Sequence, residues 1–316
     1  MTSIQAYASL TSVSPGGTID FMVSYDHGSS SPQFTVDFFR EGATEQHVGN
    51  QVTGVQAEFQ AIPINVNCLP TGCGWLKAFT LTVPTNWSSG VYIARLTGST
   101  GDTAEVLFVV GAANPGSTSK ILLALTVNSA QAYNTIGPTT FTASAPNSCL
   151  YNYPPTGSPW VLHGRIFDAL TLELPTVSFL RPGGPQDGLA YYFRTWGEQR
   201  FISWAESNGF VLEYCTGIDL HQDPNILANY QLLLSVGHDE YWSKEMRDNV
   251  EAFIGNGGNM VFFSGNVCWW QVRFGNNNST MICYKSDENG PPDPTTDPQR
   301  TTIHWFDPPV LRPETT

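Results

Sequence analysis

Short apolar or alternating runs fill the first part of the chain, and turns rich in Gly, Pro and Ser separate them. Such runs are typical of β-strands. They lie at residues 19–23, 34–39, 79–83, 91–96 and 104–110. Many short strands with regular turn signals indicate a β-sandwich over residues 1–112, and we expect it to be immunoglobulin-like.

The pattern changes after residue 112. Residues 113–119 are rich in Pro, Gly, Ser and Thr, which predicts a linker. The apolar runs at 121–127 and 231–237 are typical of strands buried on both faces, and residues 210–214 and 259–265 also have the pattern of strands. Helix-length segments alternate with them, at 189–209, 224–230 and 243–254. This alternation predicts an open, mostly parallel α/β sheet with helices on both faces over residues 120–316.

Composition limits the class of protein. A chain of 316 residues has the length of about two domains. With 41% hydrophobic and 13% charged residues it is expected to fold around a sizeable core. The net charge of −13 argues against nucleic acid as a partner. No apolar run reaches the roughly 18 residues of a membrane-spanning helix, so we expect no membrane span.

Features of the sequence favour an extracellular over a cytoplasmic location without deciding it. An extracellular location is indicated by the glycosylation sequon at residues 86–88, the few lysines and the many Ser, Thr and Asn residues. No signal peptide is visible at the start of the sequence. Cys68 and Cys73 flank a short loop and could close a local disulfide. The other four cysteines are scattered, and we expect buried free thiols among them.

Polar residues follow each of the four predicted strands. In open parallel sheets, ligands bind beyond the carboxyl ends of the strands, because the loops there converge. In chain order these residues are Tyr133, then Asp219 and His221, then His238, Asp239 and Glu240, and finally Asn266. The sequence therefore predicts a binding or active site at this edge.

His238 and Glu240 stand two residues apart, so in extended geometry their side chains point the same way. An imidazole and a carboxylate that converge suit general acid–base chemistry or metal binding. The alternative is that His238 caps a turn and Glu240 pairs with Arg247. Asp219 is better explained as a helix cap, and Asp239 is expected to face solvent or to cap the next helix.

Two kinds of candidate group are less specific. Lys285 follows an apolar segment and could be delivered to the site as a cation or lie on the surface. Trp242, Trp269 and Trp270 are expected to form pocket walls or core. The chain contains no GxSxG, P-loop, GxGxxG or HExxH motif. By elimination, an enzyme built this way would be a hydrolase that uses a carboxylate, a histidine and an unusual metal.

A family resemblance covers roughly residues 118–314. It rests on residues 131–134, 177–182, 219–221, 263–266 and 283–285, and above all on Gly-His-Asp-Glu-Tyr-Trp-Ser at 237–243. In order and spacing these segments resemble the C-terminal domain of the N,N-dimethylformamidase large (β) subunit. The sandwich, through residues 84–92, is similar to the module that precedes this domain in related proteins. The resemblance implies a glutamine-amidotransferase-like three-layer α/β domain.

The resemblance also implies a cofactor, a mononuclear ferric iron held by two tyrosinates and one glutamate. Glu240 matches the glutamate and Tyr133 one tyrosine. Tyr151 is our choice for the second tyrosine, over Tyr153, Tyr191 and Tyr192. Oxygen ligands of this kind suit ferric iron, and open coordination positions leave room for water and a carbonyl oxygen.

The same resemblance assigns three further residues. His238 and Asn266 match residues near the metal or the substrate, and Lys285 matches a lysine of the site. Family members continue beyond the end of this sequence, so we expect the α/β domain to be C-terminally incomplete. The small partner subunit of the family is not part of this chain, and a homo-oligomer stays open.

Three functional hypotheses follow. The leading one is an amidohydrolase-like protein that cleaves the C–N bond of a small or modified amide at an iron site. The second is a secreted surface or assembly protein whose α/β domain is a degenerate enzyme, which the low charge and many Ser, Thr and Asn residues favour. The third is carbohydrate binding or processing, prompted by the tryptophans.

Overall fold

The architecture was analysed in a computed structural model of the chain. It describes residues 3–27, 32–63, 66, 69–136, 150, 160–162, 165–167, 176–184, 186–286 and 292–312. In these ranges no helix is long and apolar enough to cross a membrane.

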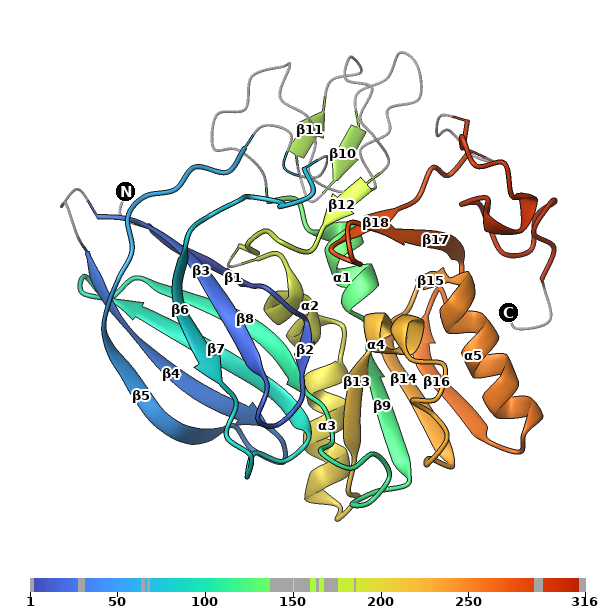
Figure 1. Ribbon diagram of the computed structural model, residues 1–316, viewed down its shortest axis with the longest axis horizontal. Coiled ribbons are helices and arrows are strands. Elements are labelled where there is room, and N and C mark those ends of the chain that lie inside the picture. The colour runs from blue at the N-terminus through green and yellow to red at the C-terminus, as the bar shows by residue number, and fades with distance from the viewer. Residues whose placement is uncertain are drawn as a thin grey trace.

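Two β-sheets make up the N-terminal part (Figure 1). Their strands are β1 (Ser3–Ala8), β2 (Ser12–Val13), β3 (Thr18–Asp26), β4 (Gln33–Glu41), β5 (Gln46–Gln56), β6 (Lys77–Thr82), β7 (Gly90–Gly98) and β8 (Thr103–Val110). One sheet has the order β1-β3-β6 and the other β2-β8-β7-β4-β5; all pairs are antiparallel except β2 with β8. Phe21 and Val23 of the first sheet share a core with Val36, Phe38 and Phe108 of the second.

Antiparallel sheets were predicted here, but β1 and β5 were not. Side chains along β5 are mostly exposed, so the strand lacks the apolar alternation that marks a half-buried strand. The immunoglobulin-like topology and the division into 1–112 and 120–316 stay predictions. No described helix or strand lies between Val110 and Ile121.

The C-terminal part is built around a parallel sheet. Its larger elements are β9 (Ile121–Leu125), α1 (Val127–Tyr133), α2 (Leu189–Thr195), α3 (Glu198–Ser207), β13 (Glu213–Thr216), α4 (Gly217–Gln222), β14 (Leu232–His238), α5 (Lys244–Gly255) and β16 (Asn259–Gly265). The strand order is β13-β9-β14-β16, all parallel, as predicted.

Smaller elements complete this part. They are β10 (Trp160–Leu162), β11 (Arg165–Phe167), β12 (Thr176–Ser178), β15 (Tyr241–Ser243), β17 (Trp270–Gly275), β18 (Thr280–Ile282) and the 3₁₀ turn η2 (Pro298–Arg300). A second sheet, which the sequence did not predict, has the order β12-β18-β17-β15. Only β15 and β17 run parallel in it.

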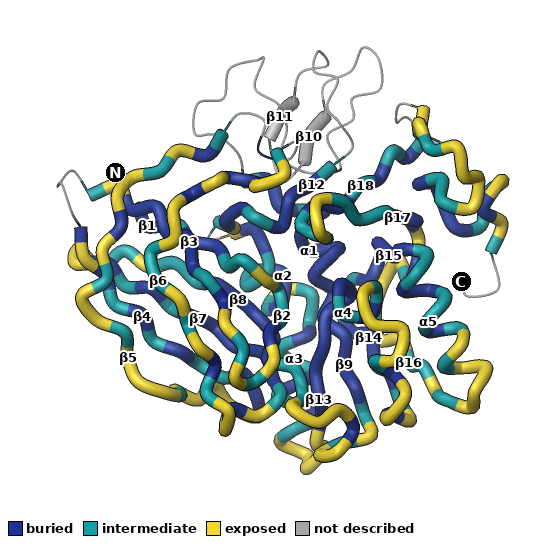
Figure 2. Tube along the Cα trace, viewed as in Figure 1, coloured by how far each residue is buried: buried dark blue, intermediate teal, exposed yellow. Residues whose placement is uncertain are grey.

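The parallel sheet lies between two layers. Leu123 of β9 faces a core that contains Ile202 of α3 and Ile93 of β7. The adjacent Leu122 faces a different core, with Leu220 of α4 and Val250 of α5. Helices therefore cover both faces as predicted, and on one face the sandwich joins α3 as part of the cover (Figures 1 and 2). The strands β9 and β14 are among the most buried parts of the chain.

Several local predictions were wrong. Residues 224–229 form turns instead of a helix, because i→i+3 bonds such as Ala228 N–H to Asn225 C=O close each one. The helix expected at 189–209 is two helices, divided by Gly197 with a φ of +103°. Cys73 is a buried free cysteine, so it does not form the local disulfide considered for it. Cys215, Cys268 and Cys283 are buried and free as expected.

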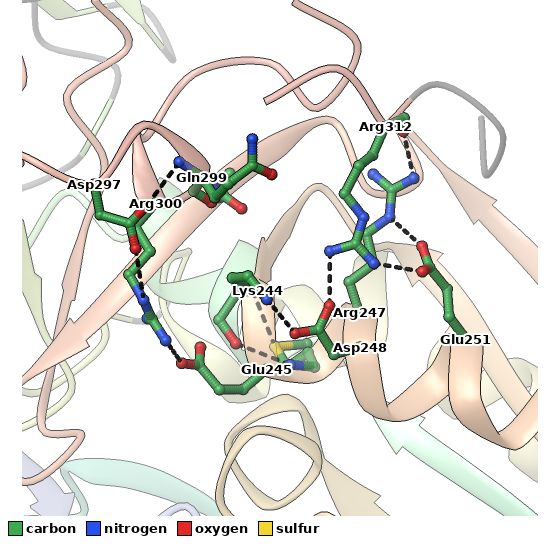
Figure 3. A network of polar contacts seen from close by, with 12 residues as sticks. Lys244, Glu245, Arg247, Asp248, Glu251, Asp297, Gln299, Arg300 and Arg312 are labelled. Atoms are coloured by element: carbon green, nitrogen blue, oxygen red, sulfur yellow. Dashed lines mark hydrogen bonds and ion pairs between the residues drawn. The ribbon is translucent and has the colours of Figure 1, made fainter. Parts of the chain in front are cut away.

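Ion pairs attach the last described segment to α5 (Figure 3). Arg312 pairs with Asp248 at 2.7 Å and with Glu251, and Arg300 pairs with Glu245. These groups are partly exposed. These ion pairs hold residues 292–312 beside α5, the helix that follows residues 237–243.

Candidate active site at the carboxyl edge of the parallel sheet

The short helix α1 carries Tyr133 to the edge of the sheet. It starts directly after β9, and all its residues except Tyr133 are buried. Ser129 Oγ accepts a hydrogen bond from the backbone N–H of Glu240 at 2.8 Å. Asn128 Nδ2 donates to the backbone carbonyl of Tyr241 at 3.0 Å. These two bonds fix α1 against the turn that follows β14.

Glu240 is the centre of the candidate site. Tyr133 Oη donates to Glu240 Oε2 at 2.9 Å, and Trp270 Nε1 donates to Oε1 at 3.1 Å. His238 Nδ1 lies 3.5 Å from Oε2. The carboxylate is only 3% exposed, so its geometry depends on these protein contacts. The structure thus brings Tyr133, His238 and Glu240 together.

The convergence of His238 and Glu240 was predicted, but its cause is different. β14 ends at His238, and Glu240 lies in the two-residue connection to β15 instead of in the strand itself. The His238 ring packs edge-on to Tyr133, with centroids 5.4 Å apart, and beside Trp196 at 5.0 Å. Its Nδ1 is buried and has no hydrogen-bond partner among the described residues. Burial lowers the pKa of His238, and the nearby Glu240 opposes that shift.

Lys285 is buried beside the cluster, so the alternative of a surface lysine is wrong. The residue is 6% exposed, and its Nζ donates to Tyr241 Oη at 2.8 Å. The same nitrogen lies 4.7 Å from the ring centroid of Trp270. Lys285 therefore contacts Trp270, the residue whose indole N–H donates to Glu240.

Among the described contacts, none joins Asn266 to this cluster. Asn266 lies one residue beyond β16, exposed, with a φ of +48°. It follows Gly265, which pairs in register with His238, so it belongs to the same edge of the sheet. Tyr151, the second tyrosine of the predicted ligand set, lies outside the described residues, as does Tyr153. Tyr192 Oη donates to the backbone carbonyl of Tyr133 at 3.2 Å.

Two buried carboxyl groups lie behind the cluster. Asp239 is 6% exposed and accepts a hydrogen bond from Ser235 Oγ at 2.6 Å, so the prediction that it faces solvent or caps the next helix is wrong. Burial raises the pKa of Asp239 to about 6. Glu198 accepts from Thr126 N–H at 2.9 Å, and burial raises its pKa to about 8, with Asp239 adding to the shift. Glu198 was not predicted, because no local motif marks it.

Arg247 and Asp219 have structural partners away from Glu240. Arg247 pairs with Glu251 at 2.8 Å, so the pairing with Glu240 that the sequence left open does not form. Asp219 forms a capping box with Thr216 at the start of α4, as the capping interpretation predicted.

The remaining predicted side chains have structural places. Ser243 caps α5, also as predicted, and its Oγ lies 2.8 Å from Nδ1 of His221. Trp242 and Trp270 are buried, while Trp269 is 38% exposed.

The sequence comparison identifies the family. The model of the family described as "N,N-dimethylformamidase beta subunit-like, C-terminal" matches residues 35–316. The chain belongs to this family. A curated relative, the N,N-dimethylformamidase beta subunit of Paracoccus aminophilus, is 22% identical over 243 residues. That alignment covers 68% of this chain and 30% of the relative, so the chain matches only about a third of the relative's length.

Solved structures add no argument about the fold. An alkylpurine DNA glycosylase of Pseudomonas fluorescens bound to abasic-site DNA matches with a TM-score of 0.21 at 9% identity, over 34% of this chain and 30% of that one. A cycloisomaltooligosaccharide glucanotransferase of Paenibacillus sp. matches with a TM-score of 0.23 at 10% identity, over 91% of this chain and 35% of that one.

The ferric iron that the sequence resemblance implies can be tested against the donor atoms of the site. In the described ranges no group of three His, Cys, Asp or Glu side chains could hold a metal. The candidate set is instead a phenol and a carboxylate, oxygen donors of the kind that hard cations prefer. Tyr133 Oη and Glu240 Oε2 are 2.9 Å apart. Neighbouring oxygen ligands at right angles around a small cation, with bonds of about 2.1 Å, have a similar separation of about 3 Å.

Proposed function

We propose that this chain carries an amide-hydrolysing site that cleaves the C–N bond of a small or modified amide at a mononuclear ferric iron. The observation that supports it most is the pairing of Tyr133 and Glu240 at 2.9 Å in a buried cluster at the edge of the sheet. Family membership points to the same chemistry, because N,N-dimethylformamidase is an amide-hydrolysing enzyme. Tyr133, Glu240 and Tyr151 are the proposed ligands.

Each residue of the site has a proposed task. Iron, when bound, supplies a Lewis acid that polarises a carbonyl and makes water more acidic. His238 Nδ1, buried beside Glu240, is placed to accept or return a proton. The Lys285 ammonium provides positive charge next to Tyr241, and Asn266 offers an amide at the rim for orienting a polar substrate. The rings of Trp196 and Tyr192 stack on each other and meet the Tyr133 ring edge-on, which supports the orientation of that tyrosine.

Iron content and visible absorption test this proposal directly. The protein loaded with ferric iron should hold about one iron per chain and show a tyrosinate-to-iron charge-transfer band. It should also release dimethylamine from N,N-dimethylformamide, or the corresponding amine from another small formamide. Glu240→Gln keeps the size of the side chain but removes the charge, so iron and the band should both be lost.

Glu245→Gln is the matched control. Glu245 lies on α5, five residues after Glu240, and pairs with Arg300. The same substitution at Glu245 should therefore leave iron and the band intact. A wild-type protein that binds no ferric iron would contradict the proposal and support a degenerate enzyme domain instead. Iron that stays bound after Glu240→Gln would contradict the ligand assignment.

A further inference from the structure

We infer that Trp270 is a positioning residue that makes Glu240 a ligand through one oxygen only. Its indole N–H holds Oε1, while Oε2 faces Tyr133 and His238. The inference rests on the proposed function, since it concerns how Glu240 would meet the metal. It goes further by assigning a task to a tryptophan that neither binds metal nor meets substrate.

The two oxygens of Glu240 have different surroundings. Oε1 accepts the indole N–H at 3.1 Å. Oε2 lies 2.9 Å from Tyr133 Oη and 3.5 Å from His238 Nδ1, so both other site residues meet this oxygen. An indole nitrogen is a donor only and cannot act as a metal ligand at neutral pH. The bond to Trp270 therefore occupies one oxygen and turns the other toward Tyr133 and His238.

The backbone of Glu240 is held as firmly as its side chain. Its carbonyl accepts from the backbone N–H groups of Trp269, at 3.0 Å, and Trp270, at 2.9 Å. Its own N–H donates to Ser129 Oγ at 2.8 Å. Because the backbone of Glu240 is fixed on both sides, the carboxylate can move only by rotation about its side-chain bonds. The hydrogen bond from the indole restricts that rotation.

Trp270 is itself locked in place. The indole is 3% exposed and stacks on the His304 ring, with centroids 3.9 Å apart and planes at 25°. His304 is held in turn by Asp307, whose carboxylate lies 3.0 Å from Nδ1. The Lys285 ammonium lies 4.7 Å from the indole centroid. A cation near the ring draws on its π electrons and so makes the N–H a stronger donor.

The inference predicts a loss of metal affinity without the loss of a ligand. Outer residues that orient a ligand are typically worth about 10–100-fold in metal affinity. Trp270→Phe keeps an aromatic ring against His304 but removes the N–H, so ferric iron should bind about 10–100-fold more weakly in competition with a chelator. The charge-transfer band should shift in position, because the carboxylate is free to bind through both oxygens.

Trp269→Phe is the matched control, because it is the same substitution one residue earlier, at a side chain that is 38% exposed. It should leave affinity within about twofold and the band in place. If Trp270→Phe behaves like Trp269→Phe, the inference is overturned while the proposed function stands. If the wild type binds no iron, both are overturned.

A measurement without iron guards against a Trp270→Phe protein that fails to fold. In protein labelled with ¹⁵N-tryptophan, one indole N–H resonance should be shifted downfield and protected from exchange by its bond to a buried carboxylate. Glu240→Ala should move that resonance upfield and speed its exchange. If no indole resonance responds to Glu240→Ala, the inference is overturned.

Discussion

Two polar clusters of this protein are built in opposite ways. At the edge of the parallel sheet, Glu240, Glu198 and Asp239 are buried and accept hydrogen bonds from uncharged indole, phenol, hydroxyl or peptide donors. On α5, Asp248 and Glu251 are partly exposed and pair with arginine or lysine (Figure 3). The first cluster surrounds the candidate site, and the second attaches a segment of chain.

The difference predicts where single substitutions are costly. A buried polar group that loses its partner costs about 1–3 kcal/mol, because water does not replace the partner. An exposed ion pair contributes about 0–1 kcal/mol and is screened by salt. The edge cluster should therefore be sensitive to pH and to small changes of shape, while the network on α5 should tolerate both.

The largest expected effect is that of pH on Glu198. Its pKa is about 8 in the folded protein and 4.5 without the burial, so the folded state favours the protonated form. This contribution to stability is complete below pH 4.5 and is lost as the pH rises through about 8. Urea unfolding should show Glu198→Gln and wild type equally stable near pH 4, with the variant gaining on the order of 5 kcal/mol by pH 8.5.

The glutamine keeps an oxygen that can accept from Thr126, so the folded structure should be retained. Because the comparison is a difference between two proteins, titrating groups that do not interact with Glu198 cancel from it; Asp239 interacts with Glu198, so the difference includes the coupling between these two carboxyl groups. Curves that stay parallel from pH 4 to 8.5 would show that Glu198 is not protonated in the folded protein.

A smaller effect is expected from crowding at Gly237. Its φ is +96°, and an added Cβ would lie 3.2 Å from Cγ of Glu198. Gly237→Ala should lower the free energy of unfolding by about 2–4 kcal/mol, from backbone strain plus this contact. Gly257, just after α5, has a φ of +92° with no atom within 4 Å of the added Cβ. Gly257→Ala should therefore lose only the strain, about 1–2 kcal/mol.

Denaturant unfolding of the two alanine variants measures both losses under one condition. The amount by which the loss of unfolding free energy in Gly237→Ala exceeds that in Gly257→Ala measures how tightly the end of β14 packs against the start of α3. Equal losses would refute the idea that the edge cluster is tightly packed there.

The smallest effect is expected on α5. Lys244 pairs with Asp248 one turn away, with both side chains partly exposed. Lys244→Ala should lower the free energy of unfolding by less than about 1 kcal/mol at low salt, and by less still in 1 M NaCl, which screens the pair. Thermal or urea unfolding at the two salt concentrations checks this. A loss above about 2 kcal/mol, or one that salt does not reduce, would remove the contrast between the clusters.

The parts that the sequence predicted well are those with strong local signals. Apolar runs predicted β14 and β16 within a residue, and Ser243 marked the start of α5. The same strand ends predicted that His238 and Glu240 meet. For β14 the local pattern is sufficient because a strand buried on both faces must be apolar throughout. The side chains of β16 are exposed or partly exposed, so there the apolar run gave the position of the strand but not its burial.

The parts that the sequence did not predict depend on distant contacts. Tyr133 meets Glu240 across 107 residues, and Trp270 meets it across 30, through pairings that no local motif announces. α1 was missed because it carries Asn128, Ser129 and Gln131 in buried positions, where their partners lie elsewhere in the chain. Glu198 has the sequence of an ordinary first helical turn, and only the packing of Thr126 against it reveals its burial.

The core that β7 and β8 share with the parallel sheet should affect how the protein responds to proteolysis between its two parts. Val91 and Val109 of the sandwich pack in the same cluster as Leu123 and Leu125 of β9. Ser12 Oγ also donates to Asp219 Oδ1 at 2.5 Å, across the two parts. A protease that cleaved the connection near residue 115 would therefore leave two fragments that remain associated, because what joins them is buried surface as much as covalent bonds.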